Sequence, residues 1–179
     1  RYAQADMISN QISLSLAKIL GADIPTSVFN EIDEANKALL FYGEHTFGFH
    51  ASVSDPFGAE SMQQQQHKAA YAWETYRRSR PIGETAMGLL QEFVPRQKEN
   101  GSIVVFNPLN WENSTSTILY ADHEVIPLNR KVLVKDEKGD TARLQLIRSY
   151  RDATYWALWV DRIPALGVKS YTIELEAGD

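Results

Sequence analysis

The sequence predicts an α+β fold, in which an N-terminal three-helix-bundle-like domain is followed by an antiparallel β-sheet or partial β-sandwich domain. Up to about Val94, apolar residues recur every three or four positions, which is the period of an amphipathic helix. After the polar stretch 96–101, apolar and β-branched residues come in short runs separated by turn signals, which is typical of strands. We therefore expect a helical domain over residues 1–96 and a β-sandwich-like domain over residues 101–179.

The first two helices are predicted from apolar stripes that end at glycines. The stripe of the first helix is Met7, Ile8, Ile12, Leu16, Ile19 and Leu20, and the stripe of the second is Val28, Ile32, Ala35, Leu39 and Tyr42. Gly21 and then Pro25 are expected to end the first helix, and the second runs into Gly43. Each stripe predicts the face that its helix buries.

The third helical segment is expected over 59–80, where the sequence is polar and alanine-rich. Its predicted face consists of Met62, Ala69, Ala70, Trp73 and Tyr76. Pro81 lacks an N–H group and crowds the preceding turn, so we expect it to kink or restart the helix, which then continues over 82–94.

Six short strands are expected in the second domain. They cover residues 102–106, 115–120, 131–134, 143–147, 155–160 and 170–175. Turn signals lie between them at 107–108, 138–140, 151–152 and 164–167. Short strands at this spacing favour an antiparallel sheet or part of a β-sandwich.

The composition limits the classes of function. The 179 residues are 44% hydrophobic and 23% charged, which is ordinary for a globular protein. A net charge of −5 argues against a nucleic-acid-binding protein, and no apolar run approaches the ~18 residues of a membrane span. The lack of cysteine excludes thiolate chemistry and fits a cytoplasmic or a periplasmic protein equally. Because the chain begins at Arg1 without an initiator methionine, we expect it to be a piece of a longer protein.

Titratable, aromatic and glycine residues crowd together in the segment 44–50. His45 and His50, with Glu44 beside the first, could supply part of a zinc or carboxylate–imidazole site. The two histidines would lie about 140° apart on a helix, unlike the one-faced pair of a His-Glu-x-x-His zinc motif. The residues alone therefore favour a capping or structural histidine. His67 is expected to be solvated and His123 to lie in a turn.

One hypothesis for the function is a noncatalytic carbohydrate-binding or structural module, an alternative to the enzyme considered below. Trp111, Trp156 and Trp159 would form its platform for stacking on sugars. Trp156 and Trp159 are three positions apart in an expected strand, so they face opposite sides of the sheet. Packing in the core or on the surface is the more common role of such residues.

Three separated segments have distinctive sequences. They are Leu-Leu-Phe-Tyr-Gly-Glu-His-Thr-Phe-Gly at 39–48, Val-Val-Phe-Asn-Pro-Leu-Asn-Trp at 104–111 and Ile-Pro-Ala-Leu-Gly-Val-Lys-Ser-Tyr at 163–171. Together they resemble glycoside hydrolase family 38, the α-mannosidase family, and particularly its bacterial branch. Their order and spacing match a helical middle domain followed by a β-sandwich. The resemblance therefore extends over most of the chain.

The resemblance implies a zinc-dependent retaining α-mannosidase. In this family the catalytic carboxylates and most zinc ligands lie in an N-terminal domain that this chain does not contain, and a further histidine ligand comes from the segment before the helical domain. His45 matches that metal ligand, and Glu44 and Phe47 are the implied substrate-binding residues. The expected partner is an α-mannoside carbohydrate, bound through the missing domain. The chain by itself, without a catalytic residue, is expected to be inactive.

Overall fold

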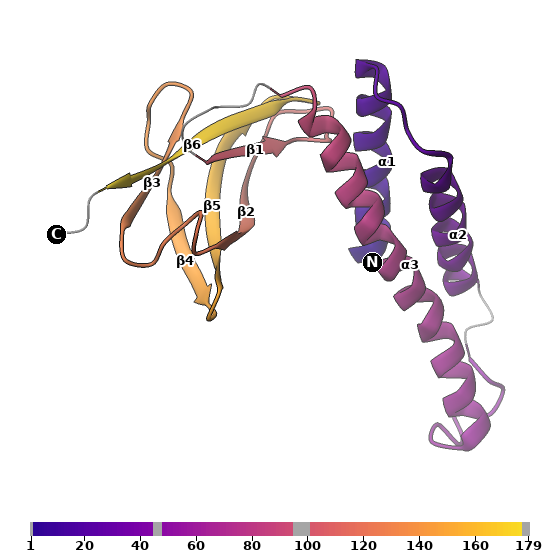
Figure 1. Ribbon diagram of the computed structural model, residues 1–179. Helices are drawn as coiled ribbons and strands as arrows, with labels where there is room; N and C mark the ends of the chain where they lie inside the picture. The colour runs from indigo at the N-terminus through magenta and orange to yellow at the C-terminus, as the bar shows by residue number, and fades with distance from the viewer. Residues whose placement is uncertain (1, 45–47, 95–100, 177–179) are drawn as a thin grey trace. The chain divides into compact units, whose positions relative to one another are not determined.

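The computed structural model describes residues 2–44, 48–94 and 101–176, and it has three helices followed by six antiparallel strands (Figure 1). The predicted α+β fold is confirmed. The chain divides into two compact units, Arg1–Val94 and Pro95–Asp179. The expected boundary stretch 96–101 lies, except for Gly101, outside the described residues, so the domain limits at 96 and 101 stay predictions.

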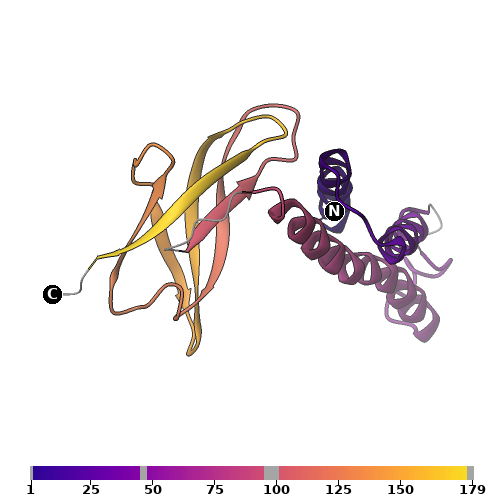
Figure 2. The ribbon, with the colours of Figure 1, turned by 45° about the horizontal axis from the view of Figure 1, so that its top comes forward.

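The helical unit is organised around its longest helix. Helices α1 (Tyr2–Leu20) and α2 (Thr26–Gly43) both pack against α3 (Ala59–Gln91), as Figures 1 and 2 show. Gly21 ends α1 as predicted, with a φ of 108° that favours glycine, and the next residue donates its N–H to the carbonyl of Ala17 at 2.9 Å. The core contains Met7, Leu14, Ile24, Val28, Ala35, Ile82 and Ala86.

Helix α1 buries only part of the predicted stripe. Met7, Leu14 and Ala17 are buried, whereas Ile8 and Ile19 of the predicted stripe are exposed. At 100° per residue, Ile8 and Ile19 point at least about 100° away from Met7. The helix carries more apolar residues than one contact needs, so hydrophobicity alone did not select the face. In α2 the predicted stripe is confirmed at Val28 and Ala35.

The contact face of α3 is polar in its first half, and the predicted face is wrong there at Ala70 and Trp73, which are exposed. Ser61, Lys68, Thr75 and Ile82 are buried at every seventh position, while Trp73 is 69% exposed. Thr75 lies in this contact at little cost because its hydroxyl donates to the carbonyls of two helices, Tyr71 at 3.0 Å and Ala35 at 3.3 Å. The helix also continues through Pro81, so it does not restart there, and the expected kink stays a prediction.

Polar side chains tie the outer helices to α3. Asn10 on α1 donates to the carbonyl of Ser79 at 2.6 Å. Arg78 on α3 contacts Glu31 on α2 at 2.6 Å and Glu74 on its own helix at 2.7 Å. A contact with few large apolar groups is therefore held by directed hydrogen bonds.

The β unit contains two sheets of three strands. The order is β1-β6-β3 in one sheet and β2-β5-β4 in the other, and all pairs are antiparallel (Figure 2). The strands are β1 (Ser102–Phe106), β2 (Asn113–Asp122), β3 (Lys131–Asp136), β4 (Leu144–Ser149), β5 (Ala153–Ile163) and β6 (Val168–Glu176). Each predicted strand is present, and β2 and β5 extend further at both ends than expected.

The core of the β unit draws on both sheets, which packs them as a partial sandwich. Val134 and Tyr171 come from one sheet, and Leu158, Val160 and Ile163 from the other. In β2, burial alternates strictly along the strand. This alternation is the mark of a sheet with one face on a core.

Asn107 joins two loops that are far apart in sequence. It is buried after β1, and its side-chain amide donates to the carbonyls of Trp111 at 2.8 Å, Pro164 at 3.0 Å and Ile163 at 3.2 Å. Its backbone N–H donates to Gly167 at 2.8 Å. Because β5 and β6 belong to different sheets, Asn107 fixes the turn by which the chain passes from one sheet to the other.

Replacing Asn107 by aspartate should therefore destabilise the β unit. Asn107→Asp keeps the side-chain size but removes the two N–H donors and places a carboxylate against carbonyl oxygens. We expect a loss of about 1–3 kcal/mol in the free energy of unfolding. Tryptophan fluorescence during urea unfolding measures it, because three of the four tryptophans lie in this unit. Asn110→Asp, the same change at an exposed position, is the control; equal stability of the two variants would contradict the role of Asn107.

The stability of the helical unit should depend on pH through Glu74. Hydrogen bonds from Arg77 and then Arg78 lower the pKa of Glu74 from 4.5 to about 2. A lowered pKa stabilises the fold above the ordinary value, and this contribution is lost as the pH falls from 4.5 toward 2.

The free energy of unfolding of the native chain should therefore exceed that of Glu74→Gln most clearly above pH 4.5, and the difference should shrink toward pH 2. Urea unfolding followed by helical circular dichroism measures both. Glu84→Gln, an exposed change on the same helix, controls for the loss of one negative charge. A difference that does not vary with pH would rule out the Glu74 contribution.

Candidate functional site

The predicted site residues follow the C-terminal end of α2. The last carbonyls of a helix have no partner inside the helix, and they form the negative end of its dipole. Glu44 is the capping residue at this end, with an extended backbone that takes the chain out of the helix. The carbonyl groups at the end of α2 therefore need a hydrogen-bond donor, and a side chain of α3 supplies one.

Lys68 of α3 provides that donor from a nearly buried position. Its Nζ donates to the carbonyl of Phe41 at 2.9 Å and to that of Glu44 at 3.4 Å, and it pairs with Glu44 Oε2 at 3.0 Å. The Lys68 side chain is only 8% exposed, whereas that of Glu44 is 39% exposed. The helix dipole and the carboxylate together compensate the burial of the ammonium group.

This arrangement gives Glu44 a defined structural partner. Its carboxylate is held by Lys68 while part of its side chain stays open to solvent. The substrate-binding role predicted for Glu44 stays a prediction. His45 and Phe47, the predicted metal ligand and substrate-binding residue, lie outside the described residues, and their roles also stay predictions.

The other histidines lie in separate surroundings. His50 packs against Phe49 with ring centroids 4.1 Å apart, and His67 is exposed on α3. His123 lies in the turn after β2, as expected, and its Nε2 is buried with no hydrogen-bond partner among the described residues. Within residues 2–44, 48–94 and 101–176, no three histidine, aspartate or glutamate side chains are grouped so that they could hold a metal ion.

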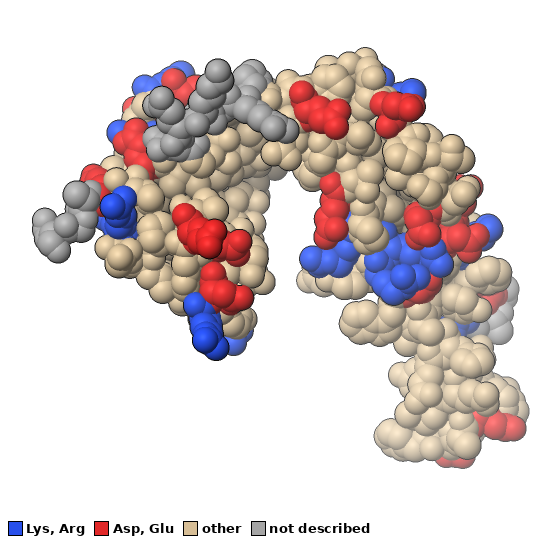
Figure 3. All heavy atoms as spheres, in the orientation of Figure 1, with Lys and Arg blue, Asp and Glu red and all other residues tan. Residues whose placement is uncertain are grey.

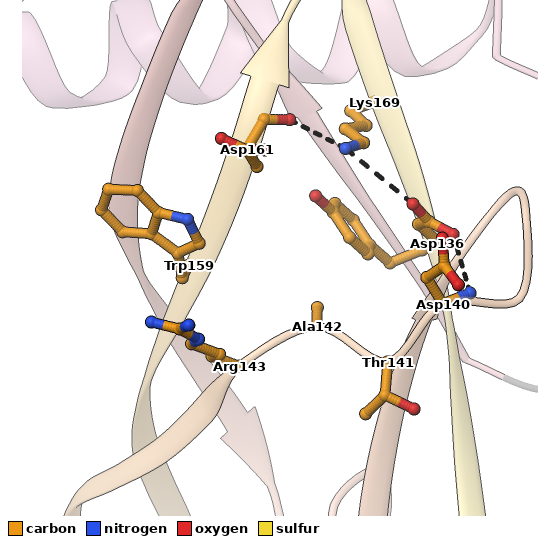
Figure 4. A pocket seen from close by; sticks show the side chains of 9 residues that line it. Asp136, Asp140, Thr141, Ala142, Arg143, Trp159, Asp161 and Lys169 are labelled. Carbon is orange, nitrogen blue, oxygen red and sulfur yellow. Dashed lines mark hydrogen bonds and ion pairs between the residues drawn. The ribbon is translucent and has the colours of Figure 1, made fainter.

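The β unit has a hollow of about 420 Å³ where the chain passes between the sheets (Figure 4). It is lined by Asp136, Asp140, Thr141, Ala142, Arg143, Trp159, Asp161, Lys169 and Tyr171. Burial raises the pKa of Tyr171, with smaller contributions from Asp136 and Asp161. Sequence reasoning singled out only Trp159 from this set. The others carry no motif, and pairing of distant strands brings them together.

The three tryptophans of the proposed sugar platform do not form one surface. Trp156 pairs with Leu119 of the core face and donates its indole N–H to Thr154 at 2.8 Å. Trp159 pairs with exposed Ser116, so it lies on the opposite face, as predicted. Of the three tryptophans, only Trp159 lines the hollow.

The surface and the helices add two general observations. On the face shown in Figure 3, acidic and basic side chains are interspersed over both units. None of the helices in the described part of the chain combines the length and the apolar character needed to cross a membrane.

Among solved structures, the chain is similar to an enzyme of the α-mannosidase class. That structure is an α-mannosidase from Enterococcus faecalis V583, with a TM-score of 0.55 and 14% sequence identity. The similarity covers 97% of this chain, but this chain spans only 23% of the length of that protein. At this identity the comparison shows a mannosidase-like fold. No model of a protein family matches the chain, and no curated protein matches it.

Lys68→Met should destabilise the helical unit. The methionine keeps most of the side-chain length but leaves the carbonyls at the end of α2 without this donor, so we expect a loss of about 1–3 kcal/mol. Helical circular dichroism during urea unfolding measures the effect. Lys37→Met removes a lysine of the exposed Glu34 pair on α2 and should change the stability little. If Lys68→Met is as stable as Lys37→Met, the capping role is wrong.

Proposed function

We propose that this chain is the helical and first β region of a zinc-dependent, retaining α-mannosidase of glycoside hydrolase family 38, in which it helps to complete the active site. The observation that carries this proposal is the fold similarity over 97% of the chain to part of an α-mannosidase. The three sequence segments that resemble the family give independent support, because the structural comparison rests on only 14% identity.

The structure also gives a physical reason for two of those segments. The segment 104–111 contains Asn107 and Trp111, and the segment 163–171 contains Ile163, Pro164 and Gly167. Asn107 is hydrogen-bonded to the other four, through its side-chain amide or its backbone N–H. Two resembling segments about 60 residues apart in sequence thus form one structural feature. A chance match of two unrelated segments would not require such a contact.

The third segment, 39–48, contains the proposed metal ligand. An imidazole is a common zinc ligand, and His45 is the residue that matches the family's ligand position. Lys68 holds the preceding residue, Glu44, by both its carbonyl and its carboxylate. In this proposal that contact positions the chain where His45 follows, and Glu44 and Phe47 contact the sugar.

In this proposal the zinc ligands are divided between this chain and the catalytic domain. A catalytic zinc needs three protein ligands, and the described residues contain no group of three that could hold a metal ion. The proposal takes one ligand from His45, which lies outside the described residues, and the other ligands from the catalytic domain. Zinc bound there would act as a Lewis acid and a template for the sugar hydroxyls. Retaining hydrolysis also needs two carboxylates about 5–5.5 Å apart, which the proposal places in that domain.

The proposal is tested in a longer chain that includes the residues preceding Arg1. His45→Ala should remove most of its hydrolysis of an aryl α-mannoside and lower its zinc content, because one metal ligand is lost. His67→Ala, at an exposed position on α3, is the matched control and should keep both. The chain of 179 residues alone should not hydrolyse the substrate with or without zinc. Turnover by this chain, or full activity of the His45→Ala variant, would overturn the proposal.

A further inference from the structure

We propose that the hollow of the β unit binds a neutral pyranose sugar, with Trp159 packing on the sugar ring and with Arg143 and Asp140 hydrogen-bonding its hydroxyl groups. The site uses residues to which the proposed function gives no role. It would make the β unit a carbohydrate-binding surface in its own right.

The hollow exists because the chain changes sheets between β3 and β4. Ala142 donates its N–H to Val134 of β3 at 2.7 Å, and the next residue, Arg143, accepts from the N–H of Trp159 on β5 at 2.9 Å. Two consecutive residues thus bridge the two sheets. The Ala142 methyl points into the hollow in Figure 4, and its small size leaves the space open.

One rim of the hollow is held in place by a network of hydrogen bonds. Asp136 accepts from the backbone N–H groups of Lys138 and Asp140 at 2.9 and 3.0 Å. Lys169 donates to the carbonyl of Asp161 at 2.8 Å, and its Nζ lies 3.9 Å from Asp136 Oδ2. Asp161 also accepts from the hydroxyl of Ser114 at 2.8 Å. The charges of Asp136 and Lys169 therefore offset each other within the protein.

Arg143 and Asp140 supply the polar groups for a ligand. Both side chains line the hollow and belong to exposed residues. A guanidinium group only donates hydrogen bonds, and a carboxylate only accepts them. Together they suit a ligand whose polar groups can each both donate and accept a hydrogen bond. Hydroxyl groups have this property. The lining holds three aspartates against Arg143 and Lys169, so its net charge is negative and an anionic ligand would be repelled.

Trp159 supplies the complementary apolar surface. It is 44% exposed and lies on the face of β5 opposite to the core, so its ring is accessible to a ligand. Figure 4 shows its ring and Arg143 on one side of the hollow, across from Asp136 and Asp140. The C–H face of a pyranose packs against an indole ring by dispersion while its hydroxyl groups remain at the edge. The volume of about 420 Å³ lies within the range of small-molecule sites.

Titration of the 179-residue chain with methyl α-D-mannoside and mannose oligosaccharides, followed by calorimetry and tryptophan fluorescence, tests the site. We expect saturable binding that weakens at least about tenfold in Trp159→Ala and in Arg143→Ala. Trp111→Ala, at another exposed tryptophan of the β unit, should bind like the native chain. Circular dichroism checks that each variant is folded. Ala142→Leu should block binding by filling the hollow without changing a polar group.

Glucuronic acid is the charged probe, and it should bind more weakly than the neutral sugar because the lining is net negative. Absence of saturable binding by the native chain would overturn the inference. So would equal binding by the folded Trp159→Ala variant, or preference for glucuronic acid over the neutral sugar. The result is separable from the mannosidase proposal, because binding is measured without catalysis. A longer chain that is inactive but binds sugar through Trp159 would overturn only the proposed function.

Discussion

Both units depend on the same constraint: a backbone carbonyl removed from water needs a hydrogen-bond donor. Asn107 meets it in the β unit, where its amide serves three carbonyls at the turn between the sheets. Lys68 meets it in the helical unit, where its ammonium group serves the end of α2. In each case one buried polar side chain donates to the carbonyls of a segment distant in the sequence. The contact holds the backbone at the end of α2 in one unit and at the turn after β5 in the other.

The two contacts have different consequences for function. Asn107 hydrogen-bonds across the segments 104–111 and 163–171, so it gives both of them a structural role in the β unit. Lys68 acts beside the segment that contains the predicted metal ligand, so it connects helix packing with the proposed chemistry. The hollow around Trp159 belongs to neither contact. It arises where the chain changes sheets, and its lining comes from the three strands β3, β5 and β6 and from the connection between β3 and β4.

The strands were more predictable than the buried helix faces. In β2 and β5, alternation and turn residues identify each strand because successive side chains point to opposite sides of a sheet. In α1, Ile8 and Ile19 looked like core residues, but the helix packs through Met7 and Leu14. In α3, the buried Lys68 and Thr75 belong to a polar sequence that hydrophobic periodicity does not detect. Their burial depends on carbonyls of α2, about 25 to 40 residues away in the chain.

The sequence by itself determined the order of a helical and a β region, the six strands and the turn at Gly21. These features depend on local periodicity and backbone conformation, which neighbouring residues set. Only the tertiary structure decided which helix faces are buried, that Lys68 holds Glu44, that Asn107 joins two loops, and that Trp159 lies beside Arg143 and Asp161. Each of these depends on contacts between residues distant in the chain, because the packing of whole elements selects among partners that the local sequence leaves equivalent.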